Sequence, residues 1–284
     1  MKIRRYSLLL LTVFPVLIQA QGKIDYGSNN GKYLTLNKTR IYYEEYGKGT
    51  PLLLLHGGLS SIKGLSTIIP ELSKHFRVIA IDAPGNGRSE QANEVSFISM
   101  ASYYSKMIDL MKLDSVYVYG FSMGGIAALH LGAERPDKVK RVVVHSAVNH
   151  LNGYNEGFAG TPDMTPEIVE KEAKWWLDGH LKRTPQPDKW KKYILDLQKM
   201  WYPEEFISDD KLRSIKNPYL ILQGDQDLIK IENALHMHRQ IAHSQLGILP
   251  NSTHFSLMED PDAVLNAIVP YLTRKAKKVF NFEY

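Results

Sequence analysis

The 284-residue sequence contains no cysteine. That absence excludes disulfides, iron–sulfur clusters, thiolate zinc sites and a cysteine nucleophile. The sequence also has no large excess of one charge, since its formal net charge is +5, and 44% of its residues are apolar against 23% charged. These proportions are those of a globular protein, not of a collagen-like or disordered chain. The length suits one large α/β domain, with or without an insertion.

The N-terminus has the pattern of a secretory signal peptide. Three basic side chains precede an apolar run, Leu8–Ile18, and the small residue Ala20 follows it. The run is shorter than the about 20 residues that a membrane span needs. We therefore predict a signal peptide over residues 1–20 and a periplasmic or secreted protein. An uncleaved anchor or a buried helix is the alternative, because Ile18 stands where a small residue usually precedes the cleavage site.

Removal of residues 1–20 takes away three positive charges and no negative ones, so the net charge falls from +5 to +2. A nearly neutral surface gives no reason to expect a nucleic acid or an anionic membrane as a partner. A chain without cysteine also cannot carry a lipoprotein anchor, so we expect no stable membrane anchor after signal cleavage. The sequence leaves the oligomeric state open.

The remaining chain alternates apolar runs typical of strands with patterns of helical period, which predicts a mainly parallel sheet with helices on both faces. The expected strands are Lys32–Leu36, Ile41–Tyr46, Leu52–Leu55, Arg77–Ile81, Ser115–Tyr119, Val139–His145, Tyr219–Leu222 and Gln245–Leu249. The expected helices are Ile62–His75, Phe97–Lys112, Ser122–Glu134, Ile231–Ala242 and Pro261–Arg274.

Residues 149–217 interrupt this alternation. They contain all four tryptophans of the chain, and their patterns are helical at Pro166–Leu177 and Lys189–Trp201. We predict a helical cap here, inserted between two core segments, residues 21–148 and 218–284. An insertion at this place usually covers a site at the carboxyl ends of the strands. We therefore expect three of its side chains to bind an apolar part of the substrate, unless they only pack the cap onto the core: Trp175, Trp176 and Trp201.

The strongest motif is Gly120-Phe121-Ser122-Met123-Gly124, which has the form G-x-S-x-G. It lies between a predicted strand and a predicted helix, where glycines permit a sharp turn that exposes the serine hydroxyl. The helix N-terminus there favours developing negative charge. The alternative is that Ser122 only caps the helix, but a cap does not require glycine on both sides.

A serine nucleophile needs a base, and the base needs a carboxylate to orient it. Asp227 and His254 each follow one of the last two predicted strands, in the chain order Ser–Asp–His. Because loops after parallel strands emerge at one edge of the sheet, the three side chains can meet. Asp225 competes with Asp227 for the orienting role, and the position in the loop favours Asp227.

The oxyanion that forms during acyl transfer needs backbone N–H donors. One is expected from Met123, directly after the serine. The other is expected from Gly58, in the His56-Gly57-Gly58-Leu59 loop, where glycines allow close approach of a substrate. His56 is interpreted as a structural hydrogen-bonding residue.

Together these motifs resemble the α/β-hydrolase superfamily, over about residues 32 to 272. The resemblance implies an eight-stranded central sheet, a Ser-His-Asp triad, a helical cap and no cofactor or metal. Superfamily members that open epoxides or displace halide use an aspartate where this chain has Ser122. The segments that carry the resemblance are His56-Gly57-Gly58, Asp82-Ala83-Pro84-Gly85-Asn86-Gly87-Arg88-Ser89, Gly120–Gly125, Gly224-Asp225-Gln226-Asp227 and Thr253-His254-Phe255.

We predict hydrolysis of a carboxylic ester of a small, partly apolar molecule through an acyl-enzyme. The loop at Gly58 lacks the proline and third glycine that would resemble proline iminopeptidases, which disfavours a peptidase. Hydrolysis of a carbon–carbon bond in a β-diketone-like substrate and acyl transfer to another acceptor would use the same triad. A non-catalytic binding protein of this fold is disfavoured because all three triad members are present.

Overall fold

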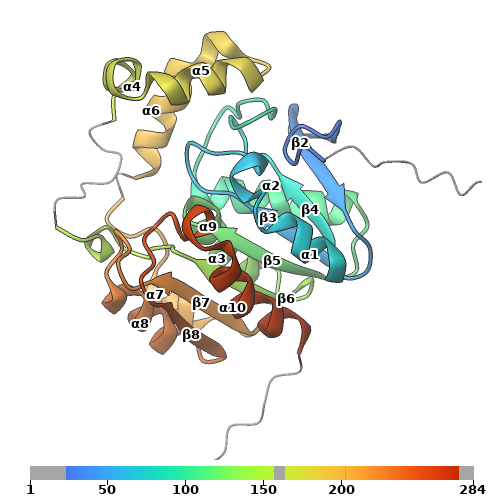
Figure 1. Cartoon of the computed structure of the whole chain (residues 1–284), viewed down its shortest axis with the longest axis vertical. Helices are drawn as coiled ribbons and strands as arrows, with labels where there is room; N and C mark the ends of the chain where they lie inside the picture. Colours follow the sequence, from blue (N-terminus) through green and yellow to red (C-terminus); the bar gives the residue numbers. More distant parts are fainter. Residues whose placement is uncertain (1–23, 157–163, 202, 275–284) are drawn as a thin grey trace, which may run out of the picture.

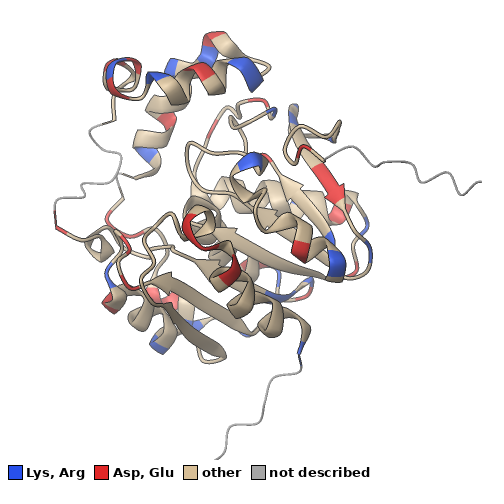
Figure 2. Ribbon diagram, viewed as in Figure 1, with Lys and Arg blue, Asp and Glu red and all other residues tan. Residues whose placement is uncertain are grey.

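The computed structural model describes residues 24–156, 164–201 and 203–274. The predicted signal peptide, residues 1–20, lies outside these ranges and stays a prediction. None of the helices in the described part of the chain combines the length and the apolarity needed to cross a bilayer. Figure 2 shows basic and acidic residues interspersed over core and cap, with no large region of one sign on the ribbon.

The core is one eight-stranded sheet in the order β1-β2-β4-β3-β5-β6-β7-β8. β2 pairs antiparallel with β1 and with β4, and every other pairing is parallel. The predicted eight-stranded, mainly parallel sheet is therefore confirmed. The strands are β1 Lys32–Leu36, β2 Thr39–Tyr46, β3 Pro51–Leu55, β4 Arg77–Ile81, β5 Val116–Phe121, β6 Val139–His145, β7 Tyr219–Gly224 and β8 Ser244–Leu249.

Helices cover both faces of the sheet (Figure 1). The helices α2, α3 and α8 pack on one face with Leu53 and Leu55 of β3, whereas α1, α9 and α10 pack on the other with Leu52 and Leu54. Burial on both faces explains why β3 is a continuous apolar run. The bounds are α1 Ile69–His75, α2 Phe97–Leu110, α3 Met123–Glu134, α8 Ile231–Gln240, α9 Ser256–Glu259 and α10 Pro261–Thr273.

Two predicted boundaries are wrong for identifiable reasons. Strand β2 begins at Thr39, not Ile41, because Asn37 and Lys38 alone form the hairpin turn, both with positive φ (49° and 67°). The predicted helix Ile62–His75 divides into a short 3₁₀ helix, Ile62–Leu65, and α1. Pro70 lies in the first turn of α1, where its missing N–H is tolerated, and it cannot continue a helix from upstream.

The cap contains α4 Pro166–Glu172, α5 Lys174–Arg183 and α6 Trp190–Met200, grouped at the top of Figure 1. The sequence pattern predicts one helix over Pro166–Leu177, but the chain breaks between α4 and α5 at Ala173, with φ −124° and ψ 31°. The short helix α7, Asp209–Arg213, falls inside the predicted insertion yet contacts the core helices α3 and α8.

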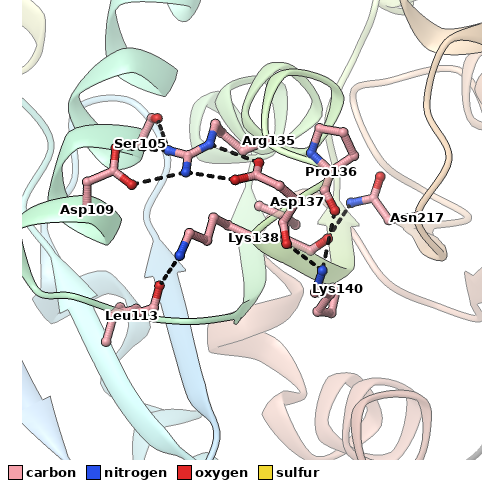
Figure 3. Close-up of polar contacts among 10 residues, drawn as sticks. Ser105, Asp109, Leu113, Arg135, Pro136, Asp137, Lys138, Lys140 and Asn217 are labelled. Carbon is pink, nitrogen blue, oxygen red and sulfur yellow. Dashed lines mark hydrogen bonds and ion pairs between the residues drawn. The ribbon is translucent and has the colours of Figure 1, made fainter.

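An ion-pair cluster ties α2 to the turn that follows α3 (Figure 3). The Arg135 guanidinium donates to the Ser105 hydroxyl at 2.7 Å, and its nitrogens lie 3.0 Å from carboxylate oxygens of both Asp109 and Asp137. This turn precedes β6, whereas Ser122 follows β5. Because β5 and β6 are parallel, the cluster lies at the opposite end of the strands from Ser122. Its role is to stabilise the core, away from the chemistry.

Candidate active site

Ser122 lies in a strained turn between β5 and α3. Its φ of 53° and ψ of −119° are unusual for a residue with a side chain. The two motif glycines are needed for close packing: a Cβ on Gly120 would lie 2.3 Å from the Gly124 carbonyl oxygen, and one on Gly124 would lie 2.5 Å from that of Leu55. The Ser122 side chain makes no capping hydrogen bond. The hydroxyl is therefore free for a role other than helix capping.

The structure brings the three predicted triad residues together. The Ser122 Oγ lies 3.1 Å from His254 Nε2, and His254 Nδ1 lies 2.9 Å from Asp227 Oδ1. Asp225 does not reach the imidazole, because its Oδ1 instead accepts the Ser252 backbone N–H at 3.0 Å. Both distances in the triad are within hydrogen-bond reach, which is the geometric requirement for nucleophile activation. The geometry thus favours Asp227 over Asp225 as the orienting carboxylate.

The Asp227 carboxylate is fully covered, with its side chain 0% exposed. Burial raises the pKa of this carboxyl, but the hydrogen bond and charge of His254 outweigh it, with help from Ser146 and the Ile229 N–H, so the pKa lies below its ordinary value. The Ile229 N–H donates to Oδ1 at 3.1 Å. Asp227 is therefore ionised near neutral pH, as it must be to hold the His254 Nδ1 proton and stabilise an imidazolium.

A buried histidine, to which no sequence motif assigns a role, lies next to the triad. His145, at the end of β6, has Nδ1 2.7 Å from the Tyr119 hydroxyl and Nε2 3.1 Å from the Ser256 hydroxyl. Burial lowers its pKa to about 3, so it stays neutral. Its ring lies 5.3 Å from that of Phe121, which lies 5.2 Å from His254. Its position at the carboxyl end of a strand was the only sequence signal.

The two residues predicted to supply the oxyanion donors, Gly58 and Met123, are neighbours in the structure. A Cβ built on Gly58 would lie 3.8 Å from Met123 Sδ, and one on Gly57 would lie 3.2 Å from Ser122 Cβ. Met123 is the first residue of α3, so its N–H has no acceptor within the helix. His56 accepts the Ala83 N–H on Nε2 at 3.0 Å, and its Nδ1 lies 2.7 Å from the Gly57 carbonyl oxygen. It fixes the loop shape, as predicted.

Ser122 and His254 open into a cavity of about 560 Å³ between core and cap. The cavity is lined by Trp175 and Trp176 from α5, and the Trp176 indole N–H donates to the Leu59 carbonyl. The break at Ala173 places α5 over the loop after β3, which explains how two adjacent tryptophans reach the cavity. Trp175 is 80% exposed, whereas Trp176 is 8% exposed.

The prediction that Trp201 binds substrate is not supported by its position. Trp201 is absent from the described lining of this cavity, is 6% exposed and packs edge-to-face against Phe97 and Phe206, at 5.3 and 5.2 Å. Its ring anchors the end of α6 on the core. The helical period shows that Trp201 lies on an apolar face, but not which partner that face meets.

Within the described ranges, no group of three or more His, Asp or Glu side chains is placed to hold a metal ion. The reactive side chains that line the cavity are Ser122 and His254, and the Asp227 carboxylate contacts His254 from behind. This arrangement can add a serine oxygen to a carbonyl carbon and stabilise the resulting oxyanion.

The model of the α/β hydrolase fold family matches residues 50–200, which include Ser122 and most of the cap. The chain belongs to the α/β-hydrolase fold family. With this match, the long-range placement of Asp227 and His254 beside the motif serine supports a hydrolase with serine-type catalysis.

Curated relatives of this α/β hydrolase span most of its length. The chain is similar to an (E)-2-((N-methylformamido)methylene)succinate hydrolase of Acinetobacter baylyi, at 26% identity over 84% of this chain and 96% of the relative. It is also similar to a 2-hydroxy-6-oxo-2,4-heptadienoate hydrolase of Pseudomonas putida, at 24% identity over 80% and 91%. A pimeloyl-[acyl-carrier protein] methyl ester esterase of Nitrosospira multiformis is 24% identical over 83% and 99%. The names of these three relatives agree that the reaction is a hydrolysis, but they differ in the compound that is hydrolysed.

Proposed function

We propose that this α/β hydrolase cleaves a carboxylic ester of a small, partly apolar molecule through an acyl-enzyme. The observation that carries the proposal is the unbroken contact from Ser122 Oγ through His254 to the buried Asp227 carboxylate, at 3.1 and 2.9 Å. The similarity to a pimeloyl-[acyl-carrier protein] methyl ester esterase supports an ester as the bond that is broken.

In this mechanism the Ser122 oxygen attacks the ester carbonyl carbon while its proton passes to His254 Nε2. The backbone N–H groups of Gly58 and Met123 stabilise the oxyanion, each lowering the barrier by roughly 3 kcal/mol. Collapse of the intermediate breaks the carbon–oxygen bond, and the leaving alcohol takes the proton from His254. Water then attacks the acyl-serine and passes one proton to His254. As the intermediate collapses, His254 returns this proton to the Ser122 oxygen, which frees the carboxylic acid and the Ser122 hydroxyl.

Hydrolysis of a carbon–carbon bond is the second candidate. The compound named for the Pseudomonas putida relative, 2-hydroxy-6-oxo-2,4-heptadienoate, contains no ester, so its hydrolysis must break a carbon–carbon bond beside a ketone. The same Ser122, His254 and oxyanion donors would serve that reaction, since both begin with addition to a carbonyl.

A substrate panel separates these candidates. Esters of graded acyl length should be assayed beside thioesters, β-diketones and 2-hydroxy-6-oxo-dienoates, with the products identified by mass spectrometry. We expect ester turnover, an acyl group on Ser122 in quenched samples, and no turnover by Ser122→Ala. Turnover of the diketones alone would replace the ester proposal with the second candidate, and product transferred to an added alcohol in preference to water would indicate an acyltransferase.

A further inference from the structure

Among Lys, Arg, Asp and Glu, only the positively charged types occur in the described lining of the cavity above Ser122. Its described lining includes two cationic side chains, Lys63 and Arg183, and no aspartate or glutamate. Asp227 lies behind His254 with its side chain fully covered, so it does not face the cavity. A cleft lined by charges of one sign concentrates ligands of the opposite sign. The wall of this cavity is therefore suited to a ligand that carries a negative charge.

Only one of these two cations already has an acidic partner among the described residues. The Lys63 ammonium pairs with the Asp25 carboxylate, and both side chains are more than half exposed. The Arg183 guanidinium, by contrast, has no ion pair and no hydrogen bond with any residue in the described ranges, and its Nε is buried without a partner. Its guanidinium folds back along α5, where a Cβ on Gly179 would lie 3.4 Å from Nη2. A buried charged donor without a partner is destabilising, so its presence needs a reason.

The ordinary reason for a cation at this place would be the end of a helix. Arg183 is the last residue of α5, and positive charge is favourable at a helix C-terminus. However, the neighbouring Lys182 is exposed to solvent and supplies that charge without burying a donor. The helix end therefore does not explain why Arg183 is partly buried and lines the cavity.

We propose that Arg183 binds a carboxylate carried by the substrate at the cap end of the cavity, while the bond to be cleaved lies at Ser122. The guanidinium offers two parallel N–H groups that match both oxygens of a carboxylate. Apolar side chains of the same lining, Trp175, Trp176 and Met258, would cover the chain in between. The substrate class is thus an acyl compound with a second, free carboxylate, such as a half-ester of a dicarboxylic acid. This inference rests on the proposed function for the bond that is cleaved.

The test compares two 4-nitrophenyl esters with acyl chains of equal length, the hexanoate and the mono-ester of adipic acid, at pH 7 and low salt. We expect kcat/KM to favour the adipate ester by roughly 10- to 100-fold, mainly through KM, as is typical of a charge-assisted hydrogen-bonded pair. Arg183→Gln should reduce that ratio to near one, and Arg183→Lys should restore part of it. The control Lys182→Gln, which changes the same charge on the exposed side of the helix end, should leave the ratio unchanged.

A binding measurement separates the subsite from the chemistry. Calorimetry on Ser122→Ala should show tighter binding of adipic acid monoamide than of hexanamide, and the difference should vanish when Arg183→Gln is added. Carboxylate-dependent binding without ester turnover would keep the subsite and overturn the ester proposal. Turnover of both esters at equal kcat/KM, or an equal loss of the preference in Lys182→Gln, would overturn the role of Arg183.

Discussion

Acid should destabilise this protein before it affects the triad carboxylate, because four histidines are buried and burial lowers the pKa of each: His56, His130, His145 and His180. Burial lowers the pKa of His56 and of His180 to about 4, with the Arg183 charge adding to the effect on His180, and lowers that of His145 to about 3. Below pH 6.5 the unfolded chain takes up protons on these side chains, whereas the folded protein does not until pH 3 to 4. The free energy of unfolding therefore falls as the pH drops below 6.5.

The magnitude follows from the size of these shifts. Between pH 7 and pH 5 each of His56, His145 and His180 lowers the free energy of unfolding by about 2 kcal/mol, so these three together lower it by about 5 to 6 kcal/mol. Asp82 acts in the opposite direction, because burial raises its pKa to about 7 and the folded protein takes up that proton first. Its protonation returns about 2 kcal/mol, which leaves a net loss of about 3 kcal/mol at pH 5 from these four groups. His130, whose pKa burial also lowers, adds to this loss.

His180 offers the cleanest variant for this test. It is 5% exposed and stacks against Trp176 and Tyr193, at 5.0 and 5.2 Å, and no hydrogen bond links its imidazole to another described residue. His180→Phe keeps a stacked ring and removes the titration. Urea unfolding at pH 7 and pH 5 should show that the variant loses about 2 kcal/mol less than the wild type. Equal losses in both proteins would refute the account of a buried neutral His180.

The other predictions concern the triad, the tryptophans and the core. Asp227→Asn should lower kcat by roughly 10⁴-fold through the wrong imidazole tautomer, while Asp225→Asn should have little effect; steady-state kinetics that reversed this order would reassign the orienting carboxylate. Trp175→Ala should change the preferred acyl length of the ester panel with little change in stability, whereas Trp201→Ala should leave the preference and lower the free energy of unfolding by about 3–5 kcal/mol. Arg135→Gln should lower it by about 1 kcal/mol, since the acidic partners are largely exposed, with kcat/KM unchanged.

Local patterns predict the catalytic framework well. The run Leu52–Leu55 predicts a strand because all four of its side chains are apolar and are buried on both faces of the sheet. The G-x-S-x-G motif predicts a sharp turn because its glycines permit close packing within a few residues. Asp227 and His254 could be assigned because they follow successive parallel strands, and such loops emerge at one edge of the sheet. The sheet and the triad geometry were thus within reach of sequence reasoning.

The cap could not be predicted at the same level. No glycine or proline near Ala173 predicts the break between α4 and α5. The Trp176 indole N–H donates to Leu59, which is 117 residues away in the chain, so no local pattern predicts this contact. Periodicity identifies an apolar helix face but not the surface that it meets, so it cannot tell a substrate contact of Trp201 from the packing against Phe97 and Phe206 that the structure shows. The contacts of His145 with Tyr119 and Ser256 are likewise long-range, and a single histidine at the end of a strand does not predict them.

The central claim is that Ser122 is the nucleophile of an acyl-transfer site. It is tested most directly by labelling the protein with a fluorophosphonate and locating the adduct by mass spectrometry. The wild type should take up one label, on Ser122, and lose esterase activity in proportion. Ser122→Ala should fold with an unchanged circular dichroism spectrum and take up no label. Labelling that persists in folded Ser122→Ala, or esterase activity that survives full labelling of Ser122, would contradict the account.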